Sequence, residues 1–272
     1  MSDEQQRRGF PSAVEDLTVH RAAVDTAQTR SPSYRLAFAD DEFLLEDGLR
    51  GVRLMLEYLK PERRMKAAGI HSTVVVFGST RVRDPDAPSP EGDSRCKLDP
   101  AYYAEARRLG ALVADATTDG TSLDFVVMTG GGPGIMEAAN RGAADGDAPS
   151  IGLNIVLPKE QVPNPYITPE FAFQFHYFAM RKLHFLLRAR ALVFFPGGYG
   201  TLDELFEALT LLQTGRIKPL PVLLFGESFW RRIIDFDGLV EIGVISPEDL
   251  ALIRFVESAE EALAIIKAAG SG

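Results

Sequence analysis

Short, almost wholly apolar runs alternate along the chain with longer segments whose apolar residues recur every three or four positions. The first run, 73–77, is rich in β-branched residues and leads into Gly78. Such runs are typical of strands buried in a parallel sheet, and the intervening periodicity predicts amphipathic helices. The predicted strands are 73–77, 124–128, 151–157, 191–195, 221–225 and 254–256, and the predicted helices are 100–115, 134–145, 176–190, 201–214 and 228–235.

This alternation predicts an α/β fold with a doubly wound, Rossmann-like parallel sheet. Helices cover both faces of such a sheet, and its ligands bind beyond the carboxyl ends of the strands. Three glycine-bearing turns, after Phe77, Met128 and Phe195, fall at that edge. We therefore expect residues 70–268 to form one domain whose motifs converge in space although they are far apart in sequence.

The segment before the first strand has a different pattern. Residues 1–38 are polar and lack sustained periodicity, so a flexible segment is expected. A helix is predicted from Asp41, and Pro61 is expected to end or kink it. Residues 39–69 are thus a predicted helical extension that packs on the main domain or on a partner subunit. Its apolar stripe consists of Leu45, Leu49, Val52, Leu56 and Leu59. A further segment, 81–99, is rich in Pro, Asp and Ser and predicts a long surface loop.

Composition narrows the class of protein. The chain has 272 residues, 46% hydrophobic and 25% charged, as is ordinary for a globular protein. The net charge of −9 argues against broad nucleic-acid binding, but a locally positive pocket can still hold a small anion. Cys96 is the only cysteine, so the chain can form neither an internal disulfide nor a thiolate metal cluster. No metal and no cofactor are expected.

The same sequence predicts a cytoplasmic protein. No uninterrupted apolar segment approaches the ~18 residues that suggest a membrane span. The first eight residues are polar and lead into no apolar region of the kind found in a secretory signal. We therefore expect neither a membrane nor a nucleic acid among its partners.

Two of the turns are dense in glycine, and a predicted helix follows each. A strand, a glycine-rich turn and a helix present bare backbone N–H groups to a phosphate, and the helix dipole adds to the attraction. Neither turn has the spacing of a dinucleotide fingerprint or of a nucleoside-triphosphatase loop. A turn that only needs positive φ is the alternative for the first. The candidate ligands of a phosphate are Gly130, Gly131, Gly132 and Gly134 in the first turn, and Gly197, Gly198, Gly200 and Thr201 in the second.

Glu204, near the start of the second of these helices, has two interpretations. Thr201 and Glu204 have the spacing of a capping box, in which the glutamate bonds the backbone N–H of the cap residue. Taken alone, that structural role is the more common one. A carboxylate beside a bound phosphate suffers like-charge repulsion, however, which a purely structural arrangement would avoid. This repulsion favours a role in chemistry.

A positive partner for that carboxylate is available in the preceding helix. Arg181 and Lys182 lie among apolar residues, either at a solvated edge or in the lining of an anionic site. Lys182 points about 100° away from Arg181 on a helix, which makes it the weaker candidate. His176 and His184 share a face but have no third ligand at metal spacing, so a structural role is favoured. The remaining candidates are Met180 and Ser79 for substrate binding, Ser79 also as a turn cap, and, more weakly, Asn140, Arg141 and Asn154.

With these motifs the chain resembles the Lonely guy (LOG) family. Its members are cytokinin riboside 5′-monophosphate phosphoribohydrolases and related bacterial nucleotide 5′-monophosphate nucleosidases, often mislabelled lysine decarboxylases. The resemblance covers about residues 70–258 and rests on segment 196–204, on the first glycine turn and on Arg181-Lys182 upstream. The sequence departs from the plant-type pattern at 135–140. The helix at 41–60 and the loop at 81–99 resemble a longer bacterial branch.

The resemblance implies a cofactor-free enzyme that hydrolyses the N-glycosidic bond of a nucleoside 5′-monophosphate to free base and ribose 5-phosphate. It implies that Arg181 and Glu204 are the catalytic pair, that the glycine turns and Thr201 hold the 5′-phosphate, and that the protein is a homodimer or a higher assembly. Three alternatives stay open: a non-catalytic nucleotide- or cofactor-binding protein, a pyridoxal-phosphate decarboxylase, and a DNA-processing protein, which the acidic charge disfavours.

Overall fold

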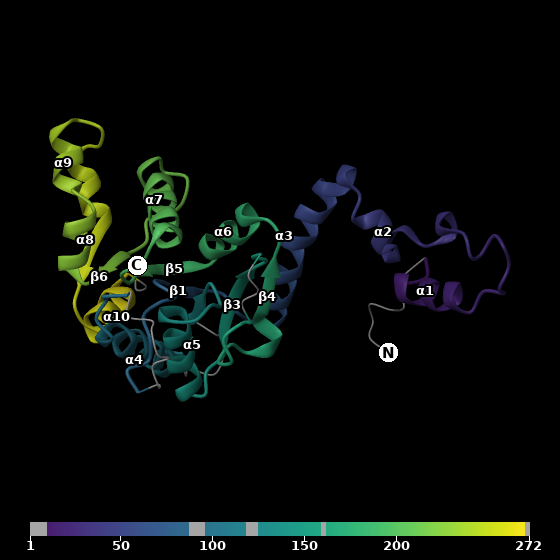
Figure 1. The fold of residues 1–272 in the computed structure, drawn as a ribbon, viewed down its shortest axis with the longest axis horizontal. Coiled ribbons are helices and arrows are strands. Elements are labelled where there is room, and N and C mark those ends of the chain that lie inside the picture. The colour runs from purple at the N-terminus through teal and green to yellow at the C-terminus, as the bar shows by residue number, and fades with distance from the viewer. Residues whose placement is uncertain (1–9, 87–95, 118–124, 159–161, 270–272) are drawn as a thin grey trace. The chain divides into compact units, whose positions relative to one another are not determined.

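The computed structural model of the protein describes residues 10–86, 96–117, 125–158 and 162–269 (Figure 1). The chain divides into two compact units, Met1–Leu56 and Glu57–Gly272. The predicted flexible segment 1–38 and the predicted surface loop 81–99 each lie in part outside the described residues, as does the first residue of the strand predicted at 124–128.

The first unit consists of short helices. They are α1 (Ala13–Arg21), the 3-10 helices η1 (Pro32–Tyr34), η2 (Ala37–Ala39) and η3 (Asp47–Leu49), α2 (Asp41–Leu44) and the start of α3 (Arg50–Ala67). The single helix predicted from Asp41 is therefore wrong: the chain forms α2, a 3-10 turn and then α3. Asp47 and Gly48 explain the break, because both residues have low helix propensity. Pro61 does not end the helix; it lies buried within α3.

The second unit is built on a seven-stranded sheet in which each strand is parallel to its neighbours. The strand order is β4-β3-β2-β1-β5-β6-β7, with Val75 of β1 in register with Met128 on one side and Leu192 on the other. The strands are β1 (Thr73–Phe77), β2 (Val126–Thr129), β3 (Ser150–Ile155), β4 (Ala172–Phe175), β5 (Ala189–Phe194), β6 (Val222–Phe225) and β7 (Ile253–Val256). This confirms the predicted α/β class.

Helices cover both faces of this sheet (Figure 1). Val74 and Val76 of β1 face one core cluster, and Val75 and Phe77 face the other, as the alternation of a strand requires. The first cluster is closed by α4 (Ala101–Ala116), α5 (Ile135–Asp145) and α10 (Ala259–Ala268). The second is closed by the end of α3, α6 (Phe178–Leu187), α7 (Tyr199–Gln213), α8 (Glu227–Ile233) and α9 (Phe236–Glu241). The 3-10 helices η4 (Pro169–Phe171) and η5 (Pro247–Leu252) complete the described elements.

Besides the 3-10 helices, four of the described elements were not predicted: α1, α9, β4 and α10. Strand β4 is a short edge strand whose residues alternate between exposed and buried, which gives a weaker signal than the wholly buried central strands. Helix α10 follows the last predicted strand. The predicted helix 176–190 is also too long, because α6 ends at Leu187 and β5 already begins at Ala189.

The chain order places a crevice beside β1. From β1 the chain moves outward to β4 and then returns to form β5 on the other side of β1. The connections after β1 and β5 therefore run in opposite directions, and such a switch point is where open parallel sheets bind ligands. Among the described residues, no helix combines the length and apolarity needed to cross a membrane.

Candidate active site

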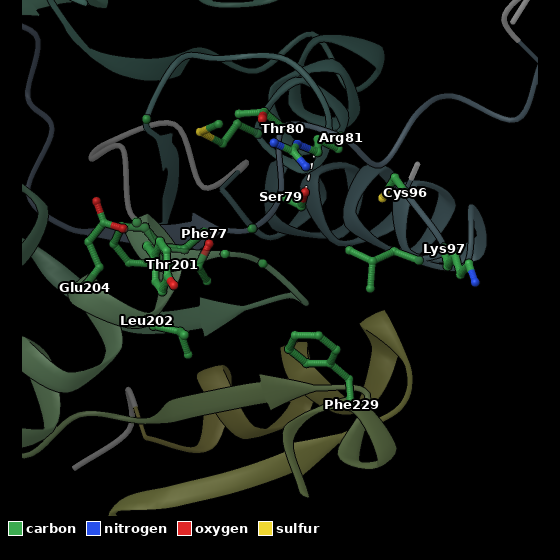
Figure 2. Close-up of a pocket in the computed structure, with 18 of the residues that line it drawn as sticks. Phe77, Ser79, Thr80, Arg81, Cys96, Lys97, Thr201, Leu202, Glu204 and Phe229 are labelled. Atoms are coloured by element: carbon green, nitrogen blue, oxygen red, sulfur yellow. Dashed lines mark hydrogen bonds between the residues drawn. The ribbon is translucent and has the colours of Figure 1, made fainter. Parts of the chain in front are cut away.

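A pocket of about 690 Å³ opens at this switch point. Figure 2 shows residues that line it. Its walls come from the segments that follow β1, β2 and β5, from the loop before α4, and from single residues of α5, α6 and α8. The lining residues are Phe77, Gly78, Ser79, Thr80, Arg81, Cys96, Lys97, Leu98, Gly130, Met136, Arg181, Gly197, Gly198, Tyr199, Gly200, Thr201, Leu202, Glu204 and Phe229.

The helix after β5 begins two residues earlier than predicted, and this removes the capping-box interpretation of Glu204. Helix α7 starts at Tyr199, and its N-cap residue is Gly198, with no side-chain cap bond. Thr201 is therefore the third helical residue and is buried, while Glu204 lies in the second turn. Because Thr201 is not the cap, Glu204 has no cap N–H to bond, and its side chain lines the pocket instead.

The first turn of α7 offers backbone donors to the pocket. The N–H of Leu202 donates to the carbonyl of Gly198 at 3.0 Å, which makes it the first closed bond of the helix. The N–H groups of Tyr199, Gly200 and Thr201 precede that bond and have no partner within the helix. A Cβ atom at Gly198 or Gly200 would meet nothing within 4 Å, so the space above these donors is open. Such a helix start suits an anion.

Arg181 and Glu204 face each other across the boundary between α6 and α7. Their side chains are only 11% and 13% exposed, and Arg181 Nη1 lies 4.0 Å from Glu204 Oε1. The guanidinium is held from behind: Nε donates to the Leu153 carbonyl at 2.7 Å, Nη2 to the Gly130 carbonyl at 3.5 Å, and the group lies over the ring of Phe185. These contacts fix the Arg181 side chain, and its positive charge stays beside the Glu204 carboxylate.

Burial controls the protonation of this pair. It raises the pKa of the Glu204 carboxyl to about 7, against the attraction of Arg181, which lowers it. Burial also lowers the pKa of Arg181, and the nearby Glu204 opposes that shift. A carboxyl that titrates near neutral pH can give or accept a proton under physiological conditions.

The first glycine turn is packed by protein rather than open. A Cβ atom at Gly130 would collide with the Arg181 guanidinium, one at Gly131 with Asn154, and one at Gly134 with the backbone of Ser79 and Thr80. The carbonyls of Gly131 and Gly132 accept bonds from the main chain and side chain of Asn164. Of this turn only Gly130 lines the pocket, whereas Gly131, Gly132 and Gly134 do not.

Ser79 joins the two turns through its backbone. Its N–H donates to the Pro196 carbonyl at 3.0 Å, and its carbonyl accepts from the N–H of Ile135 at 3.1 Å. Its hydroxyl accepts from the N–H of Arg81, as a turn-capping serine does, while the residue also lines the pocket (Figure 2). Both interpretations of Ser79 therefore have a structural counterpart.

Other candidates lie away from the pocket. Lys182 pairs with Asp203 at 2.7 Å and with Glu207 at 3.1 Å, and it does not line the pocket. Met180 does not line the pocket either and packs against the core.

The weaker candidates have structural partners. Asn140 belongs to a buried network in which it accepts from Thr129 and Asn164 and donates to Ser150. Arg141 pairs with Asp84, Asn154 donates to the Phe173 carbonyl, and His184 is buried beneath α3. In the described residues, no group of three or more His, Cys, Asp or Glu is placed to hold a metal ion.

Several lining residues were not predicted from the sequence. Thr80 and Arg81 follow β1 directly, so the rule that ligands bind at the carboxyl edge could have found them. Cys96, Lys97 and Leu98 belong to the segment predicted as a surface loop, and Phe229 comes from α8. No sequence pattern marked these four residues.

Fold and site together define a doubly wound α/β protein with an open helix start beside a buried arginine–glutamate pair. Comparison with known proteins adds the family. A family model described as "Possible lysine decarboxylase" matches residues 136–266. The chain is 36% identical to the cytokinin riboside 5′-monophosphate phosphoribohydrolase LOG1 of Arabidopsis thaliana over 166 residues, 59% of this chain and 73% of the relative. It is 30% identical to LOG7 of the same plant, over 60% of this chain and 72% of that one.

The chain therefore belongs to the LOG family of phosphoribohydrolases, as the motifs indicated. Among solved structures it is similar to a molybdenum cofactor binding protein from Rippkaea orientalis. That likeness has 21% identity and a TM-score of 0.45, and it covers 72% of this chain and 94% of the other.

Proposed function

We propose that this protein hydrolyses the N-glycosidic bond of a nucleoside 5′-monophosphate, AMP-like or a cytokinin riboside monophosphate, and releases free base and ribose 5-phosphate. The observation that carries the proposal is the buried Arg181–Glu204 pair beside the open first turn of α7. The relatives that bear the phosphoribohydrolase name support the same reaction class.

The proposed phosphate site is the start of α7. The N–H groups of Tyr199, Gly200 and Thr201 would donate to the phosphate oxygens, and the positive end of the helix dipole would add to the attraction. Binding energy from this remote group would position the sugar for reaction at C1′. Glu204 follows Gly200 by about one helical turn, so the ribose of a substrate held in this way would extend toward its carboxylate.

The proposed chemistry proceeds through an oxocarbenium-like sugar, as in glycoside hydrolysis. The bond from C1′ to the base breaks, the base leaves with the bonding electron pair and takes a proton from the solvent, and a water oxygen bonds to C1′. Ionised Glu204 would stabilise the positive sugar and accept the proton of the attacking water, a role that suits a carboxyl with a pKa of about 7. Arg181 would orient this carboxylate and favour its ionised form.

We also propose that residues 70–268 act as one nucleotide-binding catalytic domain and that the protein works as a homodimer or a higher assembly. Sedimentation of the purified chain tests the assembly: a single species at the monomer mass would contradict it.

The decisive experiment is chromatography of AMP, GMP, CMP, UMP and isopentenyl-AMP after incubation with the purified protein. Free base together with ribose 5-phosphate is the expected result. Glu204→Gln should lower turnover by about a thousandfold or more, since it removes the proton acceptor and the negative charge. Glu207→Gln is the matched control, because Glu207 lies one turn further along α7 and pairs with Lys182; it should keep wild-type turnover.

Two outcomes would contradict the proposal. Equal turnover by the wild type and by Glu204→Gln would remove Glu204 from the mechanism. Intact nucleotides from a folded protein that binds them tightly would instead support the non-catalytic binding protein. A yellow protein that retains pyridoxal phosphate would revive the decarboxylase alternative.

A further inference from the structure

Helix α6, which carries Arg181, is held by three acceptors that a single residue of α3 supplies. The carboxylate of Glu57 accepts the N–H of His176 at Oε1, 2.8 Å away, and the N–H of Tyr177 at Oε2, 3.2 Å away. Tyr177 is the N-cap residue of α6 and provides no side-chain cap of its own. A carboxylate at this position stabilises a helix through direct bonds and through the helix dipole.

The third acceptor is the main-chain carbonyl of Glu57, and Pro61 frees it. A helical residue at position 61 would normally donate its N–H to that carbonyl, but proline has none. The ring of His184, in the middle of α6, lies with Nε2 3.1 Å from this oxygen. Because a carbonyl only accepts, Nε2 carries the proton. The proline predicted to end or kink α3 thus exposes an acceptor for the neighbouring helix.

The far end of α6 is tied to the same helix. Arg188, the C-cap residue of α6, forms a two-pronged ion pair with Glu62, the residue that follows Pro61. His184 is fully buried, and its ring contacts those of Tyr58 on α3 and Phe175 on β4. The contacts at the start, middle and end of α6 therefore come from one stretch of α3, Glu57 to Glu62.

These contacts affect the candidate active site because they hold the helix that carries Arg181. On α6, Arg181 lies one turn before His184, and His184 lies one turn before Arg188. The 4.0 Å separation between Arg181 and Glu204 is thus a distance between α6 and α7, and α3 fixes one of the two helices. We propose that Glu57 is a positioning residue of this enzyme, which together with His184 holds α6 so that Arg181 stays beside Glu204. The inference rests on the proposed function for its catalytic consequence, but not for its geometry.

The first test measures ionisation in the ligand-free protein, where no turnover is needed. Four charged groups act on Glu204: Arg181 and Lys182 from α6, and Asp203 and Glu207 from its own helix. If Glu57→Gln loosens α6, Arg181 moves away from Glu204 and attracts its negative charge less. The pKa of Glu204, followed by carbon NMR of its carboxyl, should then rise by about half a unit or more. Glu260→Gln, which removes an exposed ion pair with Arg108, is the matched control and should leave this pKa unchanged.

The second test uses turnover. Glu57→Gln should lower kcat about ten- to hundredfold, because small misplacements of catalytic groups have effects of that size, while KM stays within about threefold since the α7 helix start is untouched. At position 184, Phe keeps the ring but loses the donor, whereas Gln keeps a donor that can reach the Glu57 carbonyl. His184→Phe should lower kcat, and His184→Gln should restore it in part. This pair provides the test if Glu57→Gln does not fold.

The outcomes separate the two proposals. A wild-type pKa of Glu204 and wild-type kcat in both Glu57→Gln and His184→Phe would overturn the positioning role. A shifted pKa in Glu57→Gln, in a protein whose wild type cleaves no nucleotide, would support the positioning role and contradict the proposed function. Equal loss of kcat in Glu57→Gln and in the Glu260→Gln control would also overturn it, because the effect would then not depend on α6.

Discussion

The two glycine-rich turns look alike in sequence and differ in what surrounds them. At 130–134 the space beside the glycines is filled by Arg181, Asn154 and the backbone of Ser79 and Thr80. At 197–201 the space beside Gly198 and Gly200 is open, and only Gly197 is packed, against Thr201. Glycine therefore serves close packing in the first turn and access in the second. Only in the second turn is the space beside pocket-lining glycines open, so a run of glycines by itself does not indicate a ligand.

If glycine serves close packing in the first turn, substitution of Gly134 should have the largest effect on the free energy of unfolding. This residue has φ of 73° and ψ of −130°, a region that residues with a side chain avoid, and a Cβ atom there would collide with the backbone of Ser79. Gly134→Ala should lower the free energy of unfolding by about 4 kcal/mol, roughly half from strain and half from the clash. Urea unfolding measures it. A loss below about 1 kcal/mol would show that the first turn is not held by packing.

The second effect concerns Glu204 beside the second turn, because the burial of its carboxyl makes stability depend on pH. Its pKa is raised from 4.5 to about 7, so the folded protein binds this proton more tightly than the unfolded chain. The contribution of Glu204 to the free energy of unfolding should therefore fall as the pH rises from 4.5 to about 7 and stay level above that. Glu204→Gln removes this dependence, and relative to the wild type it should gain up to about 3 kcal/mol over that interval. Urea unfolding of both proteins across the interval checks it; parallel curves would contradict it.

The smallest effect is expected at Gly200, where a substitution should improve stability but hinder access of the nucleotide. Gly200→Ala places a methyl group in open space near the helix start, and alanine is the better helix former. The free energy of unfolding should rise by up to about 1 kcal/mol, while KM for the nucleotide should increase about tenfold as the methyl group crowds the phosphate. Thermal unfolding and steady-state kinetics measure the two effects. A lower stability with an unchanged KM would instead indicate that glycine at position 200 serves packing and not ligand access.

The centre of the fold was predictable because burial makes its pattern simple. Strand β1 has its predicted bounds, 73–77, since all five of its residues are buried and four of them are apolar. Strand β4 was missed because it lies at the sheet edge and only alternate residues are buried, although Phe171, Phe173 and Phe175 show the alternation in the sequence. The pattern thus found the five inner strands and the edge strand β7, and missed the edge strand β4.

The catalytic candidates were predictable because a charged residue among apolar neighbours and a carboxylate just after a glycine-rich turn are visible in the sequence. Arg181 and Glu204 were both singled out, and they do lie together. Lys182 was ranked below Arg181 for its direction on the helix, and its pairing with Asp203 and Glu207 accords with that order. The start of α7 was placed two residues too late, because the spacing of Thr201 and Glu204 imitates a cap. The role of Pro61 could not be predicted, since it depends on a histidine 123 residues away (184 − 61 = 123).

The place of β1 at the centre of the sheet has a consequence for how the chain is made. One neighbour, β2, follows soon after β1, but the other, β5, ends 117 residues later (194 − 77 = 117). At 5–20 residues per second a ribosome needs about 6–23 s to add them. Over that interval β1, joined in turn by β2, β3 and β4, would expose an edge composed of Thr73 and four apolar residues, the kind of edge that pairs with other chains. We expect this nascent, partly formed sheet to be the species most prone to aggregation and most dependent on chaperones.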